Sequence, residues 1–164
     1  MKTVIRRMTL DDLDEVLKIE REVFPDSWSR KSFEFEVIHN KYSLPLVITL
    51  QNKVVGYSIV WKLFEEFHIA NIAIHPQMQN RGLGSYFLQE ILNLSMEQDY
   101  ALLEVRESNQ AAIHLYKKFG FLKLGIRTRY YANGENALIM KKQLKKTANN
   151  YPVRLNITQK SVEG

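Results

Sequence analysis

The chain has 164 residues, of which 45% are hydrophobic and 25% are charged, and these values are typical of one globular domain with its own core. It contains no cysteine, which excludes disulfide bonds, zinc–thiolate sites and a cysteine nucleophile. The formal net charge of +5 would suit an anionic partner such as a nucleotide-like cofactor, a ribosome surface or RNA. Several of the lysines gather near the end of the chain, however, so charge does not establish a binding face, and nucleic acid is not expected to be the main partner.

The start of the chain does not resemble a targeting segment. Charge returns at Arg6 and Arg7 before the hydrophobic region of a signal peptide can form. No later apolar run approaches the roughly 20 residues that a membrane-spanning helix needs. We therefore expect a cytoplasmic protein without a membrane partner.

Hydrophobic spacing in the first half predicts one strand, two helices and three further strands. Thr9 and Asp12 resemble a capping box that opens the first helix, and Pro25 ends that helix. The turn at residues 51–53 joins two strands as a hairpin. The six elements are expected at residues 3–7, 10–24, 30–39, 46–50, 54–63 and 67–74.

The second half predicts a helix, a strand, a second helix and a final pair of strands. Gly120 closes the second of these helices, and Asn133 with Gly134 marks the last turn. These elements are expected at residues 83–92, 100–105, 111–119, 122–129 and 137–142. The order is typical of a mixed α/β layer architecture in one domain over residues 1–144. Residues 145–164 are polar and are expected to form a tail or an extra strand.

The most informative segment is residues 71–85, where an apolar strand leads into Gln79-x-x-Gly82-x-Gly84 at the start of a helix. Glycines let backbone N–H groups converge without an intervening Cβ, and a helix N-terminus adds unpaired amides. That combination can hold a diphosphate, although a helix start that needs two small residues would look the same. A Walker loop requires Gly-Lys-Ser/Thr and a dinucleotide fingerprint requires a third spaced glycine, and neither is present.

Three polar residues further along the chain could contact one ligand. Asn109 and Tyr116 are seven positions apart, so they project from nearly the same side of one helix, and Glu104 lies on the preceding strand. Each could instead have an ordinary structural role, as a helix cap, a half-buried aromatic and an outward-facing strand residue.

Taken together, these segments resemble the GNAT superfamily of N-acetyltransferases, and most closely the RimI/Ard-type protein N-terminal acetyltransferases. The resemblance rests on Gln-x-x-Gly-x-Gly after an apolar strand and on residues 103–109 followed by Ala-x-x-Leu-Tyr and Gly-Phe. It covers residues 3–144 and implies the GNAT fold, with about four helices and a mostly antiparallel twisted sheet of about seven strands. It also implies acetyl-CoA as the cofactor and the N-terminal α-amine of proteins as the acceptor.

The resemblance further implies a role for each site residue, with Glu104 as general base and Tyr116 as general acid. An amide from Ile72 or a neighbour would stabilise the oxyanion. The residues expected to contact the cofactor are Ile72, Ala73, Ile74, Gln79, Asn80, Arg81, Gly82, Leu83, Gly84, Ser85, Asn109 and Tyr116. Those expected to contact the substrate peptide are Phe24, Pro25, Asp26, Tyr130 and Tyr131. As neighbours in a strand the two tyrosines would point to opposite faces, so only one could be in the core.

The chemistry explains why such residues are needed. An α-amine has a pKa of ~8, so much of it is ammonium at neutral pH and must lose a proton before it attacks a thioester. Glu104 can accept that proton, directly or through water, and would do so better if burial among Leu102, Leu103 and Val105 raised its pKa. Tyr116, with an ordinary pKa of ~10, holds its proton at neutral pH and can deliver it to the leaving sulfur.

Two alternatives stay open. A GNAT enzyme could acetylate a lysine side chain or a small amine, and a non-catalytic module could bind coenzyme A or RNA. Ser-His-Asp catalysis and a metal site are not expected, since the four histidines show neither spacing. The expected partners are protein or peptide N-termini, including ribosomal or nascent chains, and the expected state is a monomer or weak dimer.

Overall fold

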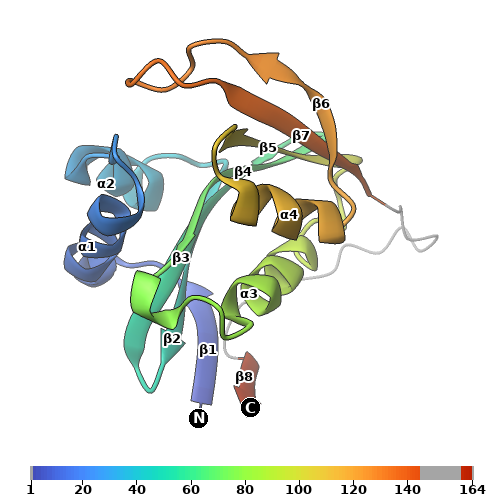
Figure 1. Ribbon diagram of the computed structural model, residues 1–164. Coiled ribbons are helices and arrows are strands. Elements are labelled where there is room, and N and C mark those ends of the chain that lie inside the picture. The colour runs from blue at the N-terminus through green and yellow to red at the C-terminus, as the bar shows by residue number, and fades with distance from the viewer. Residues whose placement is uncertain (1, 145–159, 164) are drawn as a thin grey trace.

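The computed structural model describes residues 2–144 and 160–163, which form one mixed sheet flanked by helices (Figure 1). The strands are β1 Lys2–Arg7, β2 Ser43–Leu50, β3 Lys53–Leu63, β4 Glu66–Ile74, β5 Tyr100–Arg106, β6 Leu122–Arg127, β7 Ala137–Gln143 and β8 Lys160–Glu163. The α-helices are α1 Leu13–Val23, α2 Arg30–Ile38, α3 Leu83–Leu92 and α4 Gln110–Lys118. The strand order in the sheet is β6-β7-β5-β4-β3-β2-β1-β8.

The expected order of elements and the fold class are confirmed. Neighbouring strands are antiparallel except β4 and β5, which run parallel. The resemblance implied about seven strands, and the described residues form eight because β8 pairs antiparallel with β1. Residues 145–159 lie outside the described part of the chain, so the division between domain and tail at residue 144 stays a prediction.

The helices cover both faces of the sheet, with α1 and α2 on one face and α3 and α4 on the other (Figure 1). Side chains alternate between the two cores along β2: Leu46 and Ile48 pack with α3 and α4, whereas Val47 packs with α1 and α2. A strand buried on both faces reads as a continuous apolar run, which is how β2 appears in the sequence. None of the helices in residues 2–144 is long and apolar enough to cross a membrane.

Three element boundaries differ from the predictions by two residues or more. The first helix is preceded by a 3₁₀ turn at Leu10–Asp12, and β2 starts at Ser43 because pairing with Trp61 of β3 extends it. The strand expected to reach residue 129 ends at Arg127, and the backbone of Arg129 turns to a φ of 52°. Residues 128–136 therefore form the loop between β6 and β7, which begins two residues earlier than the predicted strand end would place it.

The feature that positions the site is a split in the centre of the sheet. The parallel β4–β5 ladder runs only from the pair Glu66–Tyr100 to the pair Ile69–Leu103. A register shift in the β3–β4 pairing leaves Ala70 as a bulge immediately after the ladder ends. Beyond this point β4 and β5 continue without pairing to each other, which opens a gap between them.

Candidate active site

A pocket of about 790 Å³ occupies the gap between β4 and β5. Its walls come from the end of α1 and the loop after it, β4, the glycine turn, β5, α4 and the β6–β7 loop. The predicted site residues that line it are Phe24, Asp26, Ile72, Ala73, Ile74, Gln79, Asn80, Gly82, Gly84, Ser85, Glu104, Asn109, Tyr116, Tyr130 and Tyr131. The structure thus gathers most of the predicted residues around one cavity.

Three predicted residues do not line the pocket. The side chains of Pro25 and Arg81 are exposed, and Leu83 packs against the core under α3. They were predicted because they belong to sequence motifs. In the structure, membership of a motif does not ensure that a side chain faces the cavity. Their contacts with a ligand stay predictions.

The edge of β4 presents main-chain groups to the pocket. The His75 N–H donates to the Val55 carbonyl on β3 at 2.8 Å, so alternate residues upstream also face β3. Ile72 and Ile74 therefore direct their main-chain groups into the gap. The Ile74 carbonyl accepts a hydrogen bond from Gln79 Nε2 at 3.0 Å, which fixes the loop that follows β4.

The glycine turn adopts the backbone conformation that its composition predicts. Asn80 and Gly82 have φ values of 61° and 80°, which lie in the left-handed region, and α3 begins at the next residue. A Cβ on Gly82 would meet no atom within 4 Å, so the space beside it is open. The first amides of α3 consequently face the pocket without an intrahelical partner.

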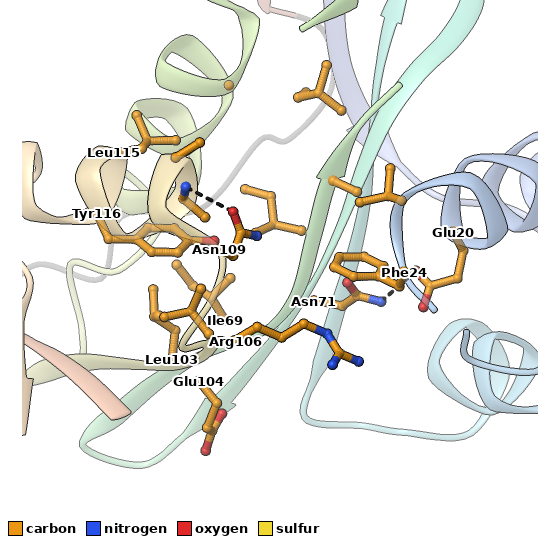
Figure 2. Close-up of a pocket in the computed structure, with 18 of the residues that line it drawn as sticks. Glu20, Phe24, Ile69, Asn71, Leu103, Glu104, Arg106, Asn109, Leu115 and Tyr116 are labelled. Atoms are coloured by element: carbon orange, nitrogen blue, oxygen red, sulfur yellow. Dashed lines mark hydrogen bonds between the residues drawn. The ribbon is translucent and has the colours of Figure 1, made fainter. Parts of the chain in front are cut away.

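Asn109 and Tyr116 extend from α4 into the same space (Figure 2). Asn109 Oδ1 accepts a hydrogen bond from the Ala112 N–H at 3.2 Å, so this side chain is the helix cap, while its amide nitrogen has no partner among residues 2–144. The Tyr116 hydroxyl makes no hydrogen bond within the same residues. Burial, together with the nearby Tyr131, raises the pKa of Tyr116. Tyr116 is therefore a protonated hydroxyl at neutral pH, free to donate to a ligand.

The Glu104 carboxylate lies on the other face of β5 from Leu103 and Val105, whose side chains are in the core. It accepts a hydrogen bond from His68 Nε2 at 2.7 Å, and Arg127 lies 3.6 Å from its second oxygen. Burial alone would raise the pKa of Glu104, but the hydrogen bond from His68 and the charges of His68 and Arg127 outweigh it and lower that pKa. The condition that would have made Glu104 a stronger base, a raised pKa, is therefore not met, and the sequence does not show which groups face this carboxylate.

Glu104 and Tyr116 approach the pocket from opposite faces of the sheet (Figure 2). Both line the cavity because the split between β4 and β5 opens it toward both faces. A molecule seated in the gap can therefore contact both residues, and no closed sheet separates them.

Tyr130 and Tyr131 lie in the β6–β7 loop, just beyond the end of the predicted strand, and both line the pocket. Their rings contact each other edge to face at a centroid distance of 5.1 Å. Neither ring is in the core, and the strand alternation that would have allowed only one of them there does not apply, since both residues lie in a loop. Burial, partly offset by Arg106, raises the pKa of Tyr131 to about 12.

Sequence reasoning missed several polar residues at or beside the pocket, among them Glu20, His68, Asn71 and Arg106. Glu20 is buried, and its carboxylate accepts hydrogen bonds from the Trp28 N–H at 2.9 Å, from Asn71 Nδ2 at 3.0 Å and from the Tyr57 hydroxyl. One signal was available, because Glu20 follows Val16 by four positions and so shares the apolar face of α1. For His68 and Arg106 the signal lies only in the pairing of strands and loops.

Comparison with known proteins agrees with this geometry. The acetyltransferase (GNAT) family profile matches residues 13–121. A Bacillus subtilis protein provisionally named as a ribosomal protein bS18-alanine N-acetyltransferase is 41% identical over 142 residues, covering 85% of this chain and 94% of its own length. An N-alpha-acetyltransferase of Saccharolobus solfataricus is 33% identical over 158 residues, covering 85% of this chain and 92% of its own length.

A solved structure shows the same likeness. The ribosomal-protein-S18-alanine N-acetyltransferase of Escherichia coli superposes with a TM-score of 0.81 at 30% identity, covering 92% of this chain and 99% of its own. The resemblance inferred from the glycine turn and from residues 103–116 is thereby confirmed. The protein with this split sheet and this pocket is a member of the GNAT acetyltransferase family.

Proposed function

We propose that this protein transfers the acetyl group of acetyl-CoA to the N-terminal α-amine of other proteins. The observation that carries the proposal is that one pocket joins the main chain of β4, the glycine turn, Tyr116 and Glu104. Its other end is formed by the aromatic loops that follow α1 and β6. The names of the relatives, which specify the alanine of a ribosomal protein or an α-amine, support a protein N-terminus as the acceptor.

The residues present fit acetyl-CoA. The turn at Gly82 leaves open space beside converging amides, which suits a diphosphate. The main chain at Ile72 and the amide nitrogen of Asn109 provide hydrogen-bonding groups along an extended arm. When bound, acetyl-CoA supplies a thioester carbonyl carbon that an amine attacks directly, so no acyl-enzyme is needed.

Glu104 is the residue placed to take the proton of the amine. Its lowered pKa keeps it ionised well below neutral pH, so it is ready to accept a proton directly or through water. His68, which is hydrogen-bonded to it at 2.7 Å, orients the carboxylate toward the pocket. A base with a lowered pKa is a weak base, so positioning of the amine beside it must supply much of the rate enhancement.

Tyr116 is the residue placed to give a proton to the departing sulfur. Its raised pKa means that the hydroxyl is protonated at every pH at which the enzyme would work. The main-chain N–H of Ile72, at the open edge of β4, can donate to the carbonyl oxygen. Glu104 and Tyr116 thus hold complementary protonation states on the two sides of the gap.

The relatives also guide the expected partners and location. Because relatives are named for a ribosomal protein, we propose that ribosomal or nascent chains are among the substrates and that the protein acts in the cytoplasm. We further propose that one chain suffices for activity, in a monomer or a weak dimer. The described residues of a single chain line every wall of the pocket, which supports this proposal.

The test separates the two acceptor nitrogens. Purified protein and acetyl-CoA are incubated with a peptide that has a free α-amine and an acetylated lysine, and with a matched peptide in which the two are exchanged. Mass spectrometry is expected to find a new acetyl group only on the α-nitrogen. Transfer to the lysine would contradict the proposal, and binding of acetyl-CoA without release of coenzyme A on any peptide would favour a non-catalytic module.

A further inference from the structure

Arg106 occupies an unusual place at the end of β5. Its side chain is 9% exposed, and its guanidinium reaches from β5 across the gap toward the side of α1 (Figure 2). One terminal nitrogen donates to Asp26 in the loop after α1. The other donates to Glu135 Oε2 at 3.1 Å and to Asn133 Oδ1 at 3.2 Å in the β6–β7 loop.

The same guanidinium also packs against Tyr131, one of the aromatic residues expected to contact the substrate peptide. Its central carbon lies 3.9 Å from the centroid of the Tyr131 ring. Arginine is suited to this position because its planar group can stack on an aromatic ring and donate in two directions at once. A lysine would offer a compact ammonium in place of the planar group that stacks on the ring.

The contact with Asp26 joins the loop after α1 to β5 and the elements that follow it. These two parts of the molecule lie on opposite sides of the gap. The loop of residues 24–29 is bonded to its own side, with Ser27 Oγ donating to the Phe24 carbonyl and the Trp28 N–H donating to Glu20. In the described ranges 2–144 and 160–163, the Asp26–Arg106 pair is the only hydrogen bond or ion pair that links this loop to β5 and the elements after it.

The opposite loop is anchored independently to the β5 side. The Ser108 N–H donates to Glu135 Oε1 at 2.9 Å, and the Glu107 N–H donates to the Asn136 carbonyl at 3.1 Å. The β6–β7 loop and Arg106 therefore form one unit, and the Asp26 carboxylate attaches the other wall of the pocket to that unit. This ion pair crosses the gap at the end of the pocket where the peptide is expected to bind, beyond the point where β4 and β5 stop pairing.

We propose that the Asp26–Arg106 ion pair acts as a strut that sets the distance between the loop of residues 24–29 and the β6–β7 loop, the two walls of the pocket that would contact the incoming peptide. Arg106 is then a positioning residue for that peptide. The role of Arg106 toward the peptide rests on the proposed function, whereas the coupling of the two loops does not. The ion pair also reassigns Asp26: its carboxylate is committed to Arg106, so an incoming peptide meets the ion pair and not a free acidic side chain. Without the Asp26 carboxylate, Arg106 keeps its ion pair with Glu135 but loses its bond across the gap, so loss of the strut should be measurable.

The first arm of the test measures the strut without using activity. Hydrogen exchange is followed in residues 128–136 of the wild type and of Asp26→Asn, which keeps the shape but removes the charge. Among the described residues Asp26 forms no hydrogen bond or ion pair with that segment; its hydrogen-bonded link to it runs through Arg106, although its charge also acts on Tyr131. Faster exchange of the hydrogen-bonded amides of Tyr131 and Gly134 in the variant is expected.

The matched control is Asp14→Asn. Asp14 also forms an ion pair with an arginine, Arg30, but the pair is exposed and lies away from the pocket. This control should leave exchange in residues 128–136 unchanged. If Asp26→Asn exchanges there like the control and the wild type, the two walls are not coupled and the strut is disproved, whether or not the enzyme acetylates peptides.

The second arm uses peptide kinetics. Asp26→Asn is expected to lower kcat/KM for the acceptor peptide by about tenfold or more, because small displacements of a reacting group are costly. The KM for acetyl-CoA should stay at the wild-type value, since that half of the pocket is unchanged. Equal losses toward both substrates would indicate general destabilisation and would overturn the positioning role. A wild type that acetylates no α-amine would instead refute the proposed function and leave the exchange result standing.

Discussion

His68 Nε2 and Glu104 Oε2 lie 2.7 Å apart across the parallel pair β4 and β5, at the last rungs before the two strands separate. The other ring nitrogen of His68 lies 3.3 Å from the Glu66 carboxylate. His68 is therefore held between two carboxylates, one that faces the pocket and one outside it. This arrangement fixes the orientation of Glu104 and lowers its pKa.

The first prediction concerns the pH dependence that follows from this contact. His68→Leu removes the hydrogen bond and charge that oppose burial, so the pKa of Glu104 should rise. A protonated Glu104 cannot act as base, so the acid limb of kcat/KM should move to higher pH in the variant. Rates measured across the pH range check this. His39→Leu, at an exposed histidine directly after α2, should keep the wild-type profile, and an unshifted limb in His68→Leu would show that His68 does not tune the base.

The second prediction concerns the proton donor. Tyr116→Phe removes the one hydroxyl that α4 directs into the pocket and should slow turnover by ~10² or more, while the affinity for acetyl-CoA measured by calorimetry stays largely intact. Tyr86→Phe is the matched control, because the Tyr86 hydroxyl is buried, unbonded within residues 2–144 and away from the pocket. Full activity in Tyr116→Phe would remove this residue from the mechanism.

The third prediction concerns the glycine turn. Gly82 and Gly134 both have left-handed φ values, of 80° and 83°, and a Cβ on either would meet no atom within 4 Å. Changing either one to alanine should cost a similar backbone strain, on the order of 1 kcal/mol. Only Gly82→Ala places a methyl group beside the amides of α3, so it should weaken acetyl-CoA binding by about tenfold or more in a calorimeter. Equal affinities in the two variants would mean that no ligand approaches this turn.

Local sequence patterns were sufficient for the elements and for much of the pocket. Gln79, Gly82 and Gly84 form a compact motif whose chemistry is carried by adjacent backbone, so the sequence shows it directly. Asn109 and Tyr116 were paired correctly because helical periodicity alone determines that they share a face. These are relations over a few residues, which short-range geometry controls.

Relations over long separations could not be read in the same way. The environment of Glu104 depends on His68, 36 positions earlier, and that of Asp26 depends on Arg106, 80 positions later. Both contacts are set by strand order and loop packing, which hydrophobic periodicity does not specify. The direction of the Glu104 pKa shift could not be predicted for this reason, since apolar neighbours were visible in the sequence and the partners that lower the pKa were not.

The last prediction tests what holds the first helix in place. Asp12 accepts hydrogen bonds from Arg6 at 2.7 and 2.8 Å and from the Thr9 N–H at 2.8 Å, and it joins β1 to the start of α1. Burial would raise the pKa of Asp12, but the bonds from Arg6 and Thr9 outweigh it and lower that pKa. Asp12→Asn should therefore reduce the free energy of unfolding at neutral pH by about 1–2 kcal/mol, a value kept small because Arg6 stays partly exposed to solvent.

The sign of its pH dependence follows from the lowered pKa. A carboxyl group with a lowered folded-state pKa stabilises the fold above its unfolded pKa of about 4, and that stabilisation is lost as the pH falls through the folded value. The difference between wild type and Asp12→Asn in urea unfolding should thus be largest at neutral pH and shrink in acid. Asp11→Asn, at the exposed neighbouring position, should change little at either pH. A difference that does not depend on pH would show that Asp12 acts by its shape and not by its charge.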